Sequence, residues 1–337
     1  MSRTATNVVL AAATLAVAGV VAWFVFQRWS TSDVRTFEEA VAQHQQDFGT
    51  MRPGGTYELK AYPAPAMHRV PTFTVHLNSR GLREREFEDL PPPGVHRIIA
   101  VGESSTFGTG VEEGERFTEL LAAELEAWRP GCCEVINAGR MGMRTERILS
   151  FLRSDVRHWG GSVLIHNSMA NDLRGSDTSP VPVMNQQVKD TYRQRLGEIV
   201  QVARDAGMEP VFWTNVNGDR RHPAMRPLQE IMKDVGSRLD VGVADLDALY
   251  TADPATPDEI DWYLDHDPWT ELNPVPVGPK TTPIERAALH VDWVHPNRFG
   301  NQRLAAGLLP LVKKAILRVE ARSAKAATDD SEVEADP

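Results

Sequence analysis

Two segments far apart in the chain carry the residue types of a serine nucleophile and its base. Ser104 follows Gly102 and Glu103, and Asp292 and His295 form an Asp-x-x-His unit. A serine hydroxyl is a weak nucleophile at neutral pH and needs an adjacent base to take its proton. His295 would be that base, and Asp292 would hold its imidazole in the required tautomer. These residue types predict nucleophilic acyl transfer.

Acyl transfer also requires hydrogen-bond donors for the negatively charged oxygen of the tetrahedral intermediate. The sequence offers three: the backbone N–H of Ser104, the backbone N–H of Gly142 and the side-chain amide of Asn171. Loss of one such donor typically lowers the rate by about 10²–10³-fold. We therefore expect Ser104, Gly142 and Asn171 to form an oxyanion hole.

The predicted strands explain how these residues could meet. Short apolar runs alternate with longer amphipathic runs, which is typical of a parallel sheet with crossover helices. The predicted strands span residues 97–101, 134–137, 163–166, 210–214 and 241–244. Ligands bind beyond the carboxyl ends of the strands in such a sheet. Because Ser104, Gly142 and Asn171 follow the first three strands, we expect them at one edge.

Three amphipathic helices are predicted around this sheet. Apolar residues recur at helical spacing over 117–128 and over 188–203, and Gly207 follows the second run. A last helix should begin near Gly300, shortly after the Asp-x-x-His unit. The sequence therefore predicts an α/β fold.

At these residues the sequence resembles the SGNH (GDSL-type) hydrolase family of esterases and acylhydrolases. The Gly-Asp-Ser block of the family corresponds to Gly102-Glu103-Ser104, and the Asp-x-x-His block to Asp292 and His295. The glycine block maps best to Gly142, with Gly139 as the competing choice. The Gly-x-Asn-Asp block maps to Met169-Ala170-Asn171-Asp172. The resemblance covers residues 97–317.

The resemblance implies a three-layer α/β/α sandwich with a central parallel sheet and a serine mechanism that needs no metal and no cofactor. It implies Ser104 as the nucleophile. Glu103, Ser105 and Met169 stand where the family usually has Asp, Leu and Gly. Met169 is expected to narrow the pocket or to shift Asn171. The motif Asn78-Ser79-Arg80-Gly81-Leu82-Arg83 resembles a lead-in of many bacterial members, and the sequence assigns it no role.

An apolar run near the N-terminus predicts membrane attachment. Residues 8–26 carry no charge, and a run of this length can cross the hydrocarbon core as a helix. Because no small-residue cleavage site follows the run, residues 1–29 are interpreted as an uncleaved signal anchor rather than a cleaved signal peptide. The positive charges lean toward a cytoplasmic N-terminus. This predicts a single-pass protein of the cytoplasmic (inner) membrane with an extracytoplasmic or periplasmic catalytic domain.

The remaining chain divides into three predicted parts. Residues 30–95 are interpreted as a stalk or cap, and residues 96–322 as the hydrolase-like domain. Within that domain, residues 247–291 are rich in proline and acidic residues and are predicted to form an irregular insertion near the site. Residues 323–337 are small and acidic, which predicts a disordered tail.

Composition excludes some other classes of protein. With 36 Lys and Arg against 46 Asp and Glu, the net charge is −10, so no basic footprint for nucleic acid is expected. Two cysteines provide neither a disulfide scaffold nor a multi-cysteine zinc site. Cys132 and Cys133 can form a vicinal disulfide, but two buried free thiols are the favoured prediction.

The leading interpretation is a serine esterase or acylhydrolase that removes acyl groups, acetyl being one candidate, from an extracytoplasmic carbohydrate or lipid ester. Transfer of the acyl group to a sugar hydroxyl is a close variant, because the same triad serves both reactions. The alternative is a catalytically inactive binding or scaffold protein of the cell envelope. The sequence identifies no particular protein partner.

Overall fold

The computed structural model describes residues 51–60, 72–169, 171–172, 185–215, 225–266, 288–290 and 295–333. The predicted signal anchor at residues 1–29 lies outside the described residues, as do Asp292 and the end of the acidic tail. Among the described helices, none combines the length and the apolar character that a membrane crossing requires.

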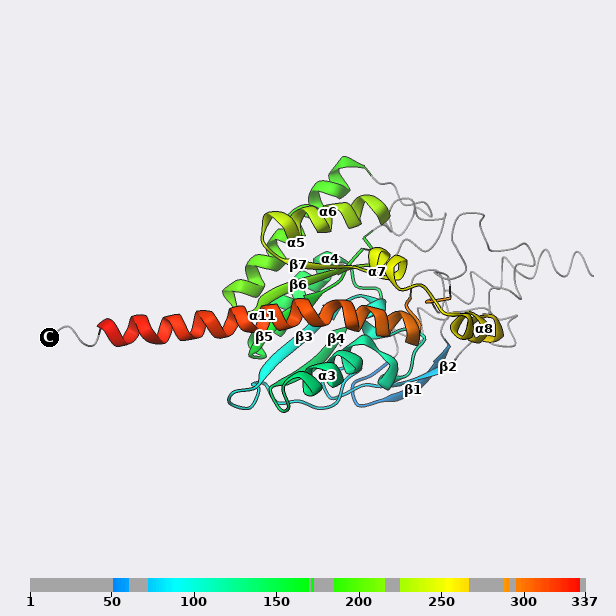
Figure 1. Cartoon of the computed structure of the whole chain (residues 1–337), viewed down its shortest axis with the longest axis horizontal. Helices are drawn as coiled ribbons and strands as arrows, with labels where there is room; N and C mark the ends of the chain where they lie inside the picture. Colours follow the sequence, from blue (N-terminus) through cyan, green and yellow to red (C-terminus); the bar gives the residue numbers. More distant parts are fainter. Residues whose placement is uncertain are drawn as a thin grey trace, which may run out of the picture.

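A five-stranded parallel sheet forms the centre of the molecule (Figure 1). The strands are arranged in the order β4-β3-β5-β6-β7. Their bounds are His96–Gly102 for β3, Cys133–Gly139 for β4, Gly161–His166 for β5, Glu209–Thr214 for β6 and Gly242–Asp245 for β7. Each predicted strand overlaps one of these five, so the predicted parallel α/β sheet is confirmed.

Helices cover both faces of this sheet (Figure 1). On one face, α3 (Phe117–Trp128), α7 (Leu246–Ala252) and α11 (Arg298–Val333) pack against alternate strand residues such as Ile98 and Ala100. On the other face, α4 (Thr145–Ser154), α5 (Gln186–Asp205) and α6 (Met225–Arg238) pack against Ile99 and Val101. Because successive strand residues point to opposite faces, one short apolar strand supplies both cores.

A separate two-stranded antiparallel sheet precedes the main sheet. It pairs β1 (Thr56–Lys60) with β2 (Thr72–His76). Phe73 and Val75 of β2 are buried in a small apolar cluster that also contains Phe107 of the short helix α2 (Ser104–Phe107). The described part of the predicted stalk or cap is therefore packed on the domain next to the predicted nucleophile.

Short helices complete the described chain. Two 3₁₀ turns, Glu113–Glu115 and Val156–His158, connect longer elements. The region predicted as an irregular insertion contains α7 and then α8 (Pro257–His266). That prediction was therefore wrong for these residues, because their proline lies at a helix start, where its missing N–H costs nothing.

The structure differs from the predicted disordered tail, since α11 continues to Val333. Residues 321–326 of this helix are exposed on all sides. Alanine, lysine and arginine predominate there, and their high helix propensity allows the last turns to extend beyond the core. Figure 1 shows this end of α11 projecting away from the sheet.

Cys132 and Cys133 form a disulfide between neighbouring residues. The favoured prediction of two free thiols was therefore wrong. Cys132 precedes β4 and follows a turn in which Gly131 has a φ of 70°. The alternation of side chains along a strand does not yet apply there, so the two sulfurs can face each other.

Candidate active site

Ser104 lies at the carboxyl edge of the sheet, where the chain turns from β3 into α2. Glu103 is still extended, with φ −90° and ψ −157°, and Ser104 begins the helix. Ser104 is partly exposed. Ser105 is only 2% exposed, and its Oγ has no hydrogen-bond partner among the described residues. The turn therefore presents the hydroxyl of Ser104 rather than that of Ser105.

His295 reaches Ser104 across 191 positions of sequence. The distance between His295 Nε2 and Ser104 Oγ is 2.8 Å, a normal hydrogen-bond length. His295 lies just before α11, and Asn297 anchors this start. Its side chain donates to Ala288 O and accepts hydrogen bonds from the N–H groups of Phe299 and Gly300. The structure thus brings together two of the three predicted catalytic residues, and the third, Asp292, lies outside the described residues.

Asn171 follows β5 and is held by Glu103. Its backbone N–H and its side-chain Nδ2 both donate to Glu103 Oε2, at 3.1 and 2.8 Å. Glu103 is completely buried. Because an amide group carries two N–H donors, this bond orients the Asn171 side chain and uses only one of them. The glutamate that replaces the usual aspartate therefore connects the turn of Ser104 to the predicted oxyanion donor.

Asn215 is a site residue that the sequence interpretation missed. It follows β6 and donates from Nδ2 to the other carboxylate oxygen of Glu103, at 2.9 Å. Its own backbone carbonyl and side-chain oxygen accept from Gln229 and Asn167. Asn215 comes directly after the fourth predicted strand, and Ser104, Gly142 and Asn171 follow the first three within a few residues, so extending that comparison to the fourth strand would have found it.

Gly142 lies in an exposed turn after β4, with a φ of 68° and no other atom within 4 Å of an added Cβ. Gly139 is different. A Cβ there would lie 2.3 Å from the backbone nitrogen of Phe107 in α2. Gly139 is thus required for packing of the strand end against α2, while the backbone at Gly142 is open to an approaching ligand.

Two further residues of the predicted asparagine block have structural roles. Both carboxylate oxygens of Asp172 lie 3.2 Å from the backbone nitrogen of Thr145, so Asp172 satisfies an N–H group at the start of α4. Met169 is completely buried in the core beneath α4 and α5. The expectation that Met169 narrows the pocket was therefore wrong, because its side chain occupies the core.

A buried histidine lies close to this edge. His166, the last residue of β5, is completely buried and its Nε2 lies 3.0 Å from Ser168 Oγ. Burial lowers the pKa of His166 to about 3, so its imidazole is neutral throughout the physiological range. His166 is therefore a residue of the core rather than a member of the candidate site.

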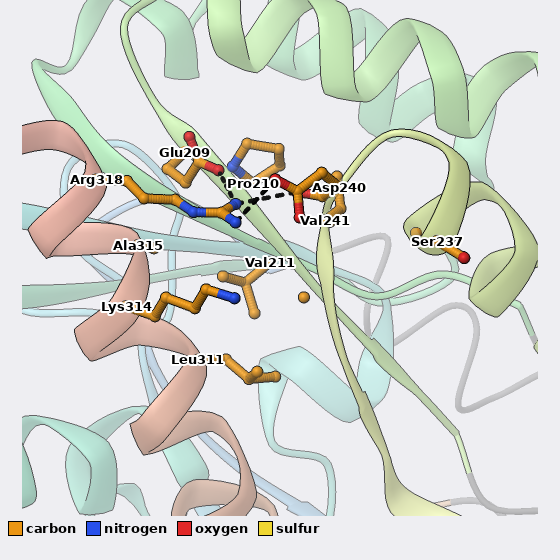
Figure 2. A pocket seen from close by; sticks show the side chains of 12 residues that line it. Glu209, Pro210, Val211, Ser237, Asp240, Val241, Leu311, Lys314, Ala315 and Arg318 are labelled. Carbon is orange, nitrogen blue, oxygen red and sulfur yellow. Dashed lines mark hydrogen bonds and ion pairs between the residues drawn. The ribbon is translucent and has the colours of Figure 1, made fainter. Parts of the chain in front are cut away.

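The opposite, amino edge of the sheet contains a cavity of about 230 Å³ (Figure 2). It is lined by the starts of β6 and β7 and by α11. Figure 2 shows Arg318 of α11 reaching toward Glu209 and Asp240, to which it donates at 3.0 and 2.8 Å. These ion pairs fix α11 to the sheet and pair Arg318 with both carboxylates that line the cavity. No serine–histidine contact is found among its lining residues, so the candidate active site is at the carboxyl edge.

Several solved structures of hydrolases are similar to this chain. Among solved structures, the chain is similar to LAE5, an α/β hydrolase from the metagenome of Lake Arreo, Spain, with 20% identity over 66% of this chain and 96% of that chain and a TM-score of 0.46. The lipase/acylhydrolase from Enterococcus faecalis matches with 20% identity, 65% and 96% coverage and a TM-score of 0.46. Axe2, an acetylxylan esterase from Geobacillus stearothermophilus, matches with 18% identity, 64% and 94% coverage and a TM-score of 0.45. A search of curated proteins finds no significant match.

The sequence model of the GDSL-like lipase/acylhydrolase family matches residues 100–303, which is more than half of the chain. The matched segment includes Ser104, Asn171 and His295. The chain therefore belongs to the GDSL-like lipase/acylhydrolase family and is an ester-bond hydrolase.

Proposed function

We propose that the protein is a serine esterase in which Ser104 is the nucleophile and His295 the general base. The 2.8 Å contact between Ser104 Oγ and His295 Nε2 is the observation that carries this proposal. In the first step, Ser104 Oγ bonds to the ester carbonyl carbon while its proton moves to His295 Nε2. The tetrahedral intermediate then breaks its bond to the alcohol oxygen, which takes that proton and leaves. Water then gives a proton to His295 and bonds to the acyl carbon. The bond from that carbon to Ser104 Oγ breaks, Ser104 takes the proton back from His295, and the acyl group leaves as a carboxylic acid.

The oxyanion of this intermediate would be stabilised by the N–H groups of Ser104 and Gly142 and by the second side-chain N–H of Asn171. The bond from Asn171 to Glu103 supports this role, because an amide already fixed in orientation loses little entropy when it binds the oxyanion. The open backbone at Gly142 also supports it. Asp292 is proposed as the residue that orients His295.

The proposed substrate is an acyl ester of a carbohydrate or a lipid outside the cytoplasm, acetyl being one candidate. The extracytoplasmic location rests on the apolar run at residues 8–26, which is proposed to anchor the protein in the inner membrane. Acyl transfer to a sugar hydroxyl would use the same residues. The inactive scaffold alternative is not favoured, since Ser104 and His295 lie within hydrogen-bonding distance.

Labelling with a serine-directed fluorophosphonate tests the mechanism. The full-length chain, purified in mild detergent, should be labelled at one site, and Ser104→Ala should lose the label while Ser105→Ala keeps it. A comparison of acetylated sugars with longer acyl esters would then define the substrate. Absence of label in the wild type, or its retention in Ser104→Ala, would contradict the proposed nucleophile.

A further inference from the structure

The motif at residues 78–83 and the adjacent Glu84, together here called the support turn, form a turn closed by hydrogen bonds of its own. Asn78 Oδ1 accepts hydrogen bonds from the backbone N–H groups of Arg80 and Leu82, both at 3.0 Å. The side chain of Leu82 is completely buried in the main core. Local hydrogen bonds from an asparagine side chain to the backbone favour a defined turn. The turn therefore gives the side chains of its last two residues, Arg83 and Glu84, defined directions.

Arg83 is completely buried and donates to backbone carbonyls on two sides. Its Nη1 donates to Gly108 O at 2.6 Å and its Nη2 to Val111 O at 2.8 Å, just after α2. Nη2 also donates to Thr74 O of β2 at 2.7 Å. Burial and the neighbouring charge of Arg116 lower the pKa of Arg83 to about 10, so the guanidinium stays charged at neutral pH. One side chain thus ties the sheet of β1 and β2 to the end of α2, the helix that begins with the proposed nucleophile.

The short helix α2 depends on such support. It has only four residues, and its last carbonyl groups have no partners within the helix. Positive charge at a helix C-terminus is favourable, because the backbone dipoles place partial negative charge there. The ring of Phe107 lies beneath the Arg83 guanidinium, with 5.6 Å between Cζ and the ring centroid. Arg83 therefore holds the end of the helix whose first residue is Ser104.

Glu84 extends this support to β4. Its Oε2 accepts from the backbone N–H of Asn137 at 2.8 Å, inside the protein. The Asn137 side chain donates to Thr106 O of α2 at 2.7 Å and accepts from the backbone N–H of Gly139 at 3.0 Å. A chain of hydrogen bonds thus runs from Glu84 to α2 and to the strand end that leads to Gly142.

We propose that the support turn is a positioning element of the active site, in which Arg83 fixes the nucleophile helix and Glu84, through Asn137, fixes the loop of the oxyanion hole. This proposal rests on the proposed esterase function. The support turn lies outside residues 100–303, so it extends the active-site machinery beyond the part that matches the family. Neither residue touches the substrate, and both act by holding backbone that does.

The proposal is tested by comparing Arg83→Ala and Glu84→Ala with Arg85→Ala, whose side chain is largely exposed. Hydrolysis of p-nitrophenyl acetate by the full-length chain should show kcat lowered about 10- to 100-fold in the first two variants, because small displacements of reacting groups have effects of this size. KM should stay within about twofold, since binding surface is kept. Arg85→Ala should retain the wild-type kcat.

Two rescues separate positioning from general loss of structure. Ethylguanidinium at millimolar concentration should restore part of the kcat of Arg83→Ala in a saturable manner, and Glu84→Gln, which keeps an acceptor for Asn137, should recover most of the activity lost in Glu84→Ala. If Arg83→Ala does not fold, the comparison of Glu84→Ala with Glu84→Gln still tests the positioning role. If the wild type is active, two results would overturn the positioning role. One is an unchanged kcat in both alanine variants, and the other is a loss of kcat that neither rescue reverses. A wild type without esterase activity would overturn the proposed function and the positioning role together.

Discussion

The two edges of the parallel sheet use polar side chains in opposite ways. At the amino edge, the charges of Glu209 and Asp240 are satisfied by Arg318 within the protein. At the carboxyl edge, the carboxylate of Glu103 is bound by amide groups of Asn171 and Asn215. Each of these amides has a second N–H donor, whereas a guanidinium between two carboxylates has its charge neutralised. Groups at the first edge hold the fold, and groups at the second orient Asn171, the proposed oxyanion donor.

The comparison also concerns burial. Arg318 is partly exposed, with 31% of its side chain accessible, so solvent screens its ion pairs. Glu103 is completely buried, where an electrostatic interaction is much stronger than in water. Substitutions at the carboxyl edge should therefore change activity strongly, and substitutions at the amino edge should change it little.

The largest effect is expected from the proposed nucleophile and base. Ser104→Ala and His295→Ala should each lower kcat for p-nitrophenyl acetate by about 10⁴-fold or more, because nucleophile and base act as one unit. Circular dichroism should show an unchanged fold. A variant of either residue that kept more than a tenth of the wild-type kcat would contradict its catalytic role.

A smaller effect is expected from Asn171, the proposed oxyanion donor. Asn171→Ala should lower kcat by about 10²–10³-fold with little change in KM, since the amide is needed mainly when the oxyanion forms. Steady-state kinetics with a short acyl ester measure both constants. A rise in KM with an unchanged kcat would instead identify Asn171 as a substrate-binding residue.

The buried histidine of the carboxyl edge predicts a dependence of stability on pH. The pKa of His166 is about 3 in the folded protein and about 6.5 in an unfolded chain, so only the unfolded state binds a proton between these values. Its contribution to stability is complete above pH 6.5 and declines as the pH falls. In urea unfolding, His166→Gln should reduce the loss of stability between pH 7 and pH 5 by about 2 kcal/mol. The exposed His158 provides a matched control, and His158→Gln should leave that loss unchanged.

Exchanging one carboxylate at each edge tests the comparison directly. Glu103→Gln should lower kcat about tenfold, because one of its acceptor oxygens becomes an NH₂ group that faces the amide of Asn171 or Asn215. Glu209→Gln, the matched substitution at the amino edge, should leave kcat unchanged. Equal losses in the two variants would remove the distinction between the edges.

The smallest effect is expected at Arg318. Arg318→Met should lower the free energy of unfolding by at most about 1 kcal/mol, because its ion pairs are partly exposed and Arg322 remains bonded to Glu209. Thermal or urea unfolding measures this change, and kcat should equal that of the wild type. A large loss of activity would show that the amino edge is coupled to the site.

Much of the fold and part of the candidate site could be predicted from the sequence. The five strands are short apolar runs bounded by turn residues, and this pattern alone predicts that they are buried in the sheet. Ser104 and His295 could be predicted because each follows or precedes a recognisable element. Asn215 was missed. The helical content of residues 247–266 was underestimated, because proline and acidic residues occur both at helix starts and in loops.

The sequence by itself determined which residues are apolar, where strands end and which side chains can act as nucleophile, base and donor. Only the tertiary structure decided that Glu103 binds Asn171 and Asn215, that Arg83 holds the end of α2 and that Met169 occupies the core. These contacts join segments separated by 25 to 112 positions. Local patterns define the elements, whereas contacts between distant segments form only when packing of the whole core brings those elements together.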